Sequence, residues 1–147
     1  MVSQLLIASA LLALCVVIHA TGVTVALRRV RRHAVRRPRA SSWIGLFVGI
    51  AGWIVLLHLL EISSWAVVYV WDEAMPDLAS ALYFSAVTYT TTGYGDLVLS
   101  KEWRLVGAIE ALTGILMCGW STGFFFAVVS RLYAEDVDKV DKKDTRL

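Results

Sequence analysis

The stretch TTGYGD at residues 91–96 has the most specific chemistry in this chain. Main-chain carbonyl oxygens can replace the hydration shell of a cation when several successive carbonyls point at one axis. An ordinary strand alternates its carbonyls, so this arrangement needs unusual dihedral angles. Gly93 and Gly95 can supply them, because glycine reaches positive φ without a Cβ clash. We therefore predict cation coordination by backbone oxygens, with the Thr91 hydroxyl as a further ligand and the Tyr94 ring packed away from the axis.

Apolar segments flank this stretch on both sides. Three of them are long enough to cross a bilayer, which takes about 20 apolar residues, and they run from about 4 to 27, 43 to 71 and 103 to 130. A shorter apolar stretch, residues 78–89, is predicted to be a re-entrant helix that starts close to Pro76, which suits a first helical turn. Non-helical backbone at membrane depth has to be buried by protein or line a watery cavity. Several copies around one axis would meet that condition.

The composition is that of a membrane protein. The chain has 147 residues, of which 58% are hydrophobic and 18% are charged, whereas an ordinary soluble domain has about 25% charged residues. Cys15 and Cys118 lie in apolar segments, where a thiol behaves as a small hydrophobe. The sequence contains no nucleophile–base pair and no full metal set, so we expect neither an enzyme nor an organic cofactor.

A block of arginines sets the expected topology. Seven arginines supply half of the 14 basic residues, and the positive-inside rule makes this loop cytoplasmic. The amino terminus is then outside and the carboxyl terminus is in the cytoplasm of a multi-pass protein of the cell membrane, which we expect to be a bacterial inner membrane. We expect the block to contact anionic lipid headgroups and not nucleic acid. Its members are Arg28, Arg29, Arg31, Arg32, Arg36, Arg37 and Arg39.

Residues 88–97 resemble the signature sequence of tetrameric potassium channels, with Thr92 where the usual form has valine. The resemblance covers roughly Trp43 to Arg131, the pore module of two-transmembrane channels. It implies an all-α membrane protein in which an outer helix, a re-entrant pore helix with a filter and an inner helix form each subunit of a homotetramer, here with an extra N-terminal transmembrane helix. The expected parts are an N-terminal transmembrane helix (1–27), an Arg-rich cytoplasmic linker (28–42), the pore module (43–131) and a charged cytoplasmic tail (132–147).

The resemblance also implies the function, which is passive permeation of potassium through residues 91–95, called the filter segment below. Two alternatives stay open: a weakly selective cation channel of the same architecture, and a non-conducting membrane regulatory subunit. We expect the first apolar helix to be peripheral and to take no part in conduction. We expect the tail to be a frayed extension of the third span that then becomes disordered. The implied ligands of K⁺, the permeant ion, are oxygens of Thr91, Thr92, Gly93 and Tyr94.

Three residues are expected to support the filter segment. In the resembling channels the residue that matches Asp96 bonds to an aromatic side chain of the pore helix. Tyr83 and Phe84 occupy that region, and only Tyr83 has a hydroxyl to donate. Val87 lies behind the filter, where some members of the family carry a carboxylate.

Ionisable residues inside the spans often carry function. His58 and Glu61 are three residues apart in the second span and share a helix face, and Glu110 lies in the third span. Three hypotheses remain open for them: a buried polar contact that steadies the pore module, a proton-sensitive switch, and a His/Glu metal site that includes Glu110.

The third span also holds candidates for gating. In the resembling channels the inner helix bends at a glycine, for which Gly114 is the nearest match and Gly119 the next. Close helix packing is the alternative for each glycine. One of the three phenylalanines at 124–126, with Phe125 as the first candidate, could form a hydrophobic constriction that gates by dewetting.

Overall fold

Four helices make up the computed structural model, which describes residues 2–34 and 41–144, with side chains for 2–30 and 44–131. Three helices have spans that are long and apolar enough to cross a membrane: Val2–Val30, Ile44–Trp71 and Arg104–Arg131. The fourth is shorter. The predicted three spans and short pore helix are therefore confirmed. In chain order the helices are α1 (Val2–Ala34), α2 (Ser41–Trp71), α3 (Leu78–Tyr89) and α4 (Arg104–Asp144).

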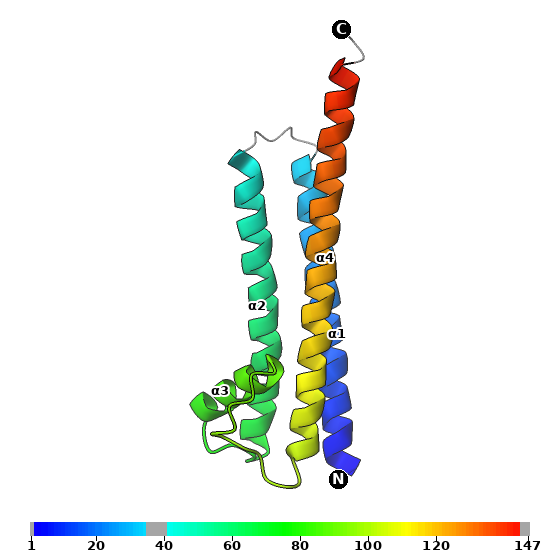
Figure 1. Ribbon diagram of the computed structural model, residues 1–147. Coiled ribbons are helices and arrows are strands. Elements are labelled where there is room, and N and C mark those ends of the chain that lie inside the picture. The colour runs from blue at the N-terminus through cyan, green and yellow to red at the C-terminus, as the bar shows by residue number, and fades with distance from the viewer. Residues whose placement is uncertain (1, 35–40, 145–147) are drawn as a thin grey trace.

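The three long helices run side by side, and α3 with the loop that follows it lies against one end of the bundle (Figure 1). The amino terminus lies at that same end, whereas the C-terminal end of α1, the start of α2 and the end of α4 lie at the other. Helix α1 packs on α2 and α4, and α3 packs on the same two helices. Helices α2 and α4 have little direct contact, so α1 and α3 join them.

Helix α1 is an integral part of this bundle. Its buried residues recur every three or four positions, so they form one stripe that faces α2 and α4. At Gly22 the helices approach closely, since an added Cβ would lie 2.4 Å from the Leu57 side chain. The Trp53 indole N–H also donates to the Gly22 carbonyl at 3.0 Å. The structure therefore shows where this helix packs, which the sequence left open. The stripe comprises Ala8, Leu11, Cys15, His19, Val23, Ala26 and Val30.

The pore helix α3 starts with a side-chain cap. The Asp77 carboxylate accepts hydrogen bonds from the Ser80 backbone N–H at 2.9 Å and from the Ser80 hydroxyl at 2.8 Å. These bonds from Ser80 hold the pKa of the Asp77 carboxyl below its usual range. Since Asp77 is the N-cap, Pro76 stands one residue before the cap and not in the first turn, where the sequence placed it.

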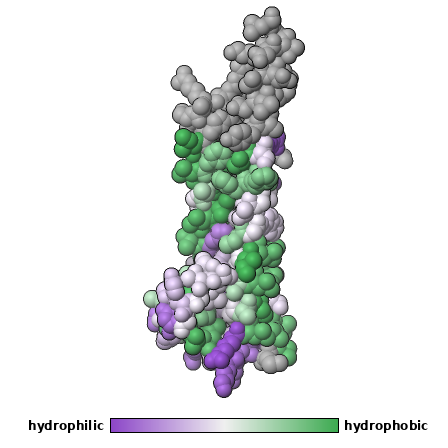
Figure 2. Space-filling view, in the orientation of Figure 1, coloured by the Kyte–Doolittle hydropathy of each residue, from purple (hydrophilic) through white to green (hydrophobic). Residues whose placement is uncertain are grey.

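Apolar side chains cover most of the visible outer face of the long helices, and hydrophilic colour gathers at the end that carries the filter segment (Figure 2). Exposed residues such as Val48, Val67, Ile115 and Phe126 belong to this apolar surface. An apolar surface of this extent marks contact with lipid or with other protein. Beyond the membrane span, α4 remains helical to Asp144, so the expected helical extension of the third span reaches that residue.

Candidate functional site

Residues with positive φ alternate along the filter segment with residues that lack it. Thr91 has φ +59°, Gly93 has φ +58° and Gly95 has φ +77°, whereas Thr92 and Tyr94 between them do not have positive φ. This alternation departs from an ordinary strand, whose φ is negative throughout. The sequence predicted positive φ at both glycines, and this is confirmed.

Thr91 was not predicted to have positive φ. A β-branched residue in the left-handed region is a genuine outlier, and such strain costs about 1–3 kcal/mol and gathers at functional sites. Three hydrogen bonds hold this conformation. The Thr91 N–H donates to the Thr88 carbonyl at 2.9 Å, and the N–H groups of Thr92 and Gly93 donate to the Val87 carbonyl at 2.9 and 3.2 Å. Carbonyl groups at the end of α3 therefore accept the hydrogen bonds from the N–H groups of residues 91–93.

The hydroxyl of Thr92 has a partner within its own subunit. Its Oγ1 lies 3.0 Å from Oγ1 of Thr90, whose hydroxyl also lies 2.7 Å from the Ala86 carbonyl. The threonine that replaces the usual valine is thus bonded to a neighbouring side chain. This arrangement ties the middle of the filter segment to the last turn of the pore helix.

Tyr83 and Asp96, the pair that the sequence singled out, are hydrogen-bonded. The Tyr83 hydroxyl donates to Oδ2 of Asp96 at 2.7 Å, and Oδ1 accepts from the Leu97 N–H at 3.0 Å. The bond from Tyr83 lowers the pKa of the Asp96 carboxyl. Phe84 instead packs edge-on against Tyr69 of α2. The Tyr83 side chain therefore links the pore helix to the outer end of the filter segment.

Val87 lies behind the filter segment. Together with Tyr83 and Asp96 it lines a cavity of about 180 Å³, which also reaches Gly93 and Gly95. The side chain of Val87 has no polar atom to offer to this cavity. The polar contribution of this residue comes from its carbonyl, which accepts the two amide bonds described above.

Replacing Tyr83 with phenylalanine is expected to destabilise the filter segment without preventing assembly, because the change removes only the hydroxyl that bonds Asp96. The bond lowers the pKa of Asp96 from its ordinary value of 3.8. The hydrogen bond therefore stabilises the folded protein above pH 3.8, and this stabilisation is lost as the pH falls through the lowered pKa. The melting temperature of Tyr83→Phe should be lower than that of the unaltered protein at neutral pH. The two melting temperatures should converge in acid. Equal melting at neutral pH would contradict a supporting role for Tyr83.

The gating candidates lie in different surroundings. A Cβ at Gly114 would meet the Tyr89 carbonyl oxygen at 1.9 Å, whereas a Cβ at Gly119 would meet nothing within 4 Å. Phe125 packs on Phe47 of α2, with ring centroids 5.8 Å apart, and Phe126 is 71% exposed. Gly114 is thus a packing contact between α4 and the pore helix, and Phe126 is the phenylalanine that faces outward from the subunit.

Glu110 is a buried carboxylate that connects three helices. The Tyr69 hydroxyl of α2 donates to Oε2 of Glu110 at 2.7 Å, and the Ser85 hydroxyl of α3 bonds to Oε1. The Ser85 hydroxyl also lies 2.9 Å from the Ile62 carbonyl. Glu110 therefore fixes α3 between the two spans that flank it.

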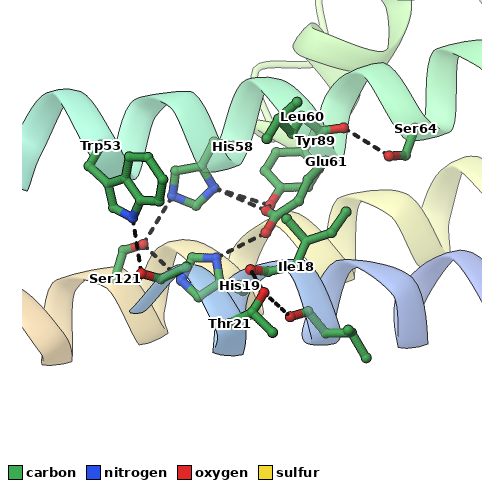
Figure 3. Close-up of polar contacts among 12 residues, drawn as sticks. Ile18, His19, Thr21, Trp53, His58, Leu60, Glu61, Ser64, Tyr89 and Ser121 are labelled. Atoms are coloured by element: carbon green, nitrogen blue, oxygen red, sulfur yellow. Dashed lines mark hydrogen bonds and ion pairs between the residues drawn. The ribbon is translucent and has the colours of Figure 1, made fainter. Parts of the chain in front are cut away.

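Glu61 belongs to a second buried group, which Figure 3 shows. Oε1 of Glu61 lies 3.0 Å from Nδ1 of His19, and Oε2 lies 3.4 Å from Nδ1 of His58 and accepts a hydrogen bond from the Tyr89 hydroxyl. The sequence grouped His58 and Glu61 with Glu110. In the structure His19 of α1 takes that third place.

His19 is the residue that the sequence analysis missed. It is fully buried, and it lies four positions after buried Cys15 and four before buried Val23. An isolated histidine on the buried stripe of an otherwise apolar span was the available signal. It was overlooked because α1 was expected to be peripheral.

The comparison with known families assigns the chain. A model described as an ion channel matches residues 55–131, just over half of the chain. The chain belongs to the ion channel family. The match covers just over half of α2, all of α3, the filter segment and the membrane span of α4, so α1 is an addition to the family's pore module. No curated protein and no solved structure matches this channel.

Proposed function

We propose that the protein is a potassium-selective channel, in which the filter segments of four identical subunits meet on one axis. The observation that carries this proposal is the alternation of φ at Thr91, Gly93 and Gly95. This alternation supports carbonyls that point to a common side, as a ring of backbone oxygens requires. Residues 91–94 then supply the oxygens that hold dehydrated K⁺, and Gly95 and Asp96 shape the outer mouth.

The exposure of the filter segment supports the need for further subunits. Every residue from Thr90 to Val98 is exposed in the single chain, although the family works inside a membrane. Backbone polar groups in a bilayer need partners or a watery cavity. Closed fourfold symmetry places four such strands around one water-filled path, and it also covers apolar residues of α4 such as Ile115 and Phe126.

The arrangement of charges supports the proposed orientation. Arg28 and Arg29 lie near the end of α1, and Arg131 lies near the end of the α4 span, all away from the filter segment. By the positive-inside rule this end faces the cytoplasm and the filter segment faces outward. Arg36, Arg37 and Arg39 fall outside the described residues. We also propose contact with anionic lipid at Arg29, whose guanidinium lies 5.3 Å from the Trp53 ring centre beside a cavity of about 370 Å³.

Purified protein in liposomes should pass K⁺ and Rb⁺ and exclude Na⁺, because the spacing of the oxygens replaces the hydration shell of the larger ions. The measurement is ion-driven flux with each cation in turn, with empty liposomes as the baseline. Equal flux of Na⁺ and K⁺ would favour a weakly selective cation channel. No flux from correctly assembled protein would favour a non-conducting subunit.

A further inference from the structure

Five side chains from all four helices form a closed ring of contacts at the centre of the bundle (Figure 3). Glu61 contacts Nδ1 of His19 at 3.0 Å, and Nε2 of His19 contacts Oγ of Ser121 at 3.1 Å. The same Oγ lies 3.1 Å from Nε2 of His58, and Nδ1 of His58 lies 3.1 Å from the Tyr89 hydroxyl. That hydroxyl bonds back to Glu61 and closes the ring.

The ring has one hydrogen too few for its five contacts, and it therefore lacks one positive charge. Five contacts need five hydrogens, but two neutral imidazoles, one serine hydroxyl, one tyrosine hydroxyl and a carboxylate supply only four. His19 and Glu61 are fully buried, and a buried carboxylate is costly unless a positive charge compensates it. The ring therefore needs either an added proton or a bound cation.

The geometry distinguishes between these two. A proton needs one donor–acceptor pair, whereas here His19, His58 and Glu61 each offer one ligand atom, and these three atoms all lie within 4.8 Å of one another. Nδ1 of His19 lies 3.0 Å from Oε1 of Glu61, and Nδ1 of His58 lies 3.4 Å from Oε2 of the same carboxylate. Zinc bonds of about 2.0–2.1 Å to nitrogen and oxygen in a tetrahedral site put neighbouring ligand atoms about 3.3 Å apart. The two nitrogen–oxygen distances are thus close to the spacing of zinc ligands, and binding through a single oxygen would require a rotation of the Glu61 carboxylate.

The outer contacts also suit a metal. When both histidines bind through Nδ1, each carries its hydrogen on Nε2, and both Nε2 atoms face the one oxygen of Ser121. A hydroxyl oxygen has two lone pairs and can accept both bonds. Histidine ligands nearly always donate their second N–H in this way. Ser121 also lines a cavity of about 490 Å³ between α2 and α4.

We propose that His19, His58 and Glu61 form a buried binding site for a transition-metal dication of the zinc class. The set of two imidazoles and one carboxylate is one that zinc uses, and imidazole nitrogen disfavours Mg²⁺ and Ca²⁺. The Tyr89 hydroxyl lies 3.1 Å from Nδ1 of His58 and bonds to Glu61. Because Tyr89 ends the pore helix and Thr90 follows it, the metal would tie α1 and α2 directly to the base of the filter segment.

The test is metal retention by the full-length protein. Protein stripped with a chelator is loaded with zinc, desalted and analysed for zinc per chain by elemental mass spectrometry. One zinc per chain is expected for the unaltered protein and for Glu110→Gln, the matched control, since Glu110 is equally buried but bonds to Tyr69 and Ser85. Glu61→Gln and His19→Gln are expected to retain none. Gel filtration shows whether each variant keeps its assembly.

A second measurement covers the case in which the ligand variants fail to fold. Ser121→Ala leaves all three ligands in place and removes only the outer oxygen, so zinc affinity should fall about 10- to 100-fold. Cobalt, used as a visible probe, should give the intense absorption of a tetrahedral site in the unaltered protein. The proposal would be overturned if the unaltered protein retained no zinc or if Glu61→Gln retained as much zinc as the unaltered protein. An octahedral cobalt spectrum would also overturn it.

Discussion

Replacing Gly95 with alanine is expected to abolish potassium flux. Gly95 has φ +77°, and no atom lies within 4 Å of the position that a Cβ would take, so the cost within one subunit is conformational and not steric. Holding an L-residue in the left-handed region costs about 1–2 kcal/mol, and four copies in one ring make this roughly 4–8 kcal/mol. That cost is comparable with the whole stability of a domain, about 5–15 kcal/mol. The filter segment is therefore expected to leave the aligned conformation.

The control for Gly95→Ala is Gly52→Ala, which also adds one methyl group in open space but lies in helix α2, where φ is negative. It should keep full K⁺ flux and melt at the same or a higher temperature, because alanine favours helix by about 1 kcal/mol over glycine. D-alanine at position 95, introduced by semisynthesis, should restore flux because its preferred φ is positive. Normal K⁺ flux through Gly95→Ala tetramers would count against the proposed filter geometry.

Local chemistry made much of this fold predictable from the sequence. The bilayer requires long apolar helices, so three spans could be read from hydropathy alone. Positive φ at Gly93 and Gly95 followed from the need to align carbonyls, and glycine is the residue that permits it. Tyr83 was preferred to Phe84 because only one of them has a hydroxyl for Asp96, and the structure forms that bond at 2.7 Å.

The features that were missed depend on residues far apart in the chain. His58 and Glu61 are three positions apart, so their pairing follows from one helix, whereas His19 is 42 positions from Glu61 and meets it only when α1 packs on α2. The positive φ of Thr91 is similarly imposed by bonds to the end of α3. The sequence also shows Gly114 without showing whether it bends or packs, because that depends on where the Tyr89 carbonyl lies.

Replacing Gly114 with alanine is expected to be the most damaging single-methyl change in α4 among the glycines of the membrane span. The new Cβ would lie 1.9 Å from the Tyr89 oxygen and 2.7 Å from its carbonyl carbon, and contacts under 3.0 Å essentially never occur for a Cβ. The obstacle is backbone, so no rotamer change relieves it, and α4 has to move away from α3 by more than 1 Å. Overpacking of this kind costs about 1–3 kcal/mol, which exceeds the gain of about 1 kcal/mol from better helix propensity.

The experiment separates this packing role from the hinge role that the sequence suggested. If Gly114 packs α4 against the base of the filter segment, Gly114→Ala lowers the melting temperature and the K⁺ flux together, and Gly114→Val prevents assembly. If Gly114 is only a hinge, alanine stiffens α4, so the protein melts no lower while the fraction of open channels changes. Gly123→Ala is the matched control in the same helix, because its Cβ would meet no atom within 4 Å. Since the end of α3 also carries the bonds that hold Thr91 to Gly93, we expect stability and flux to fall together.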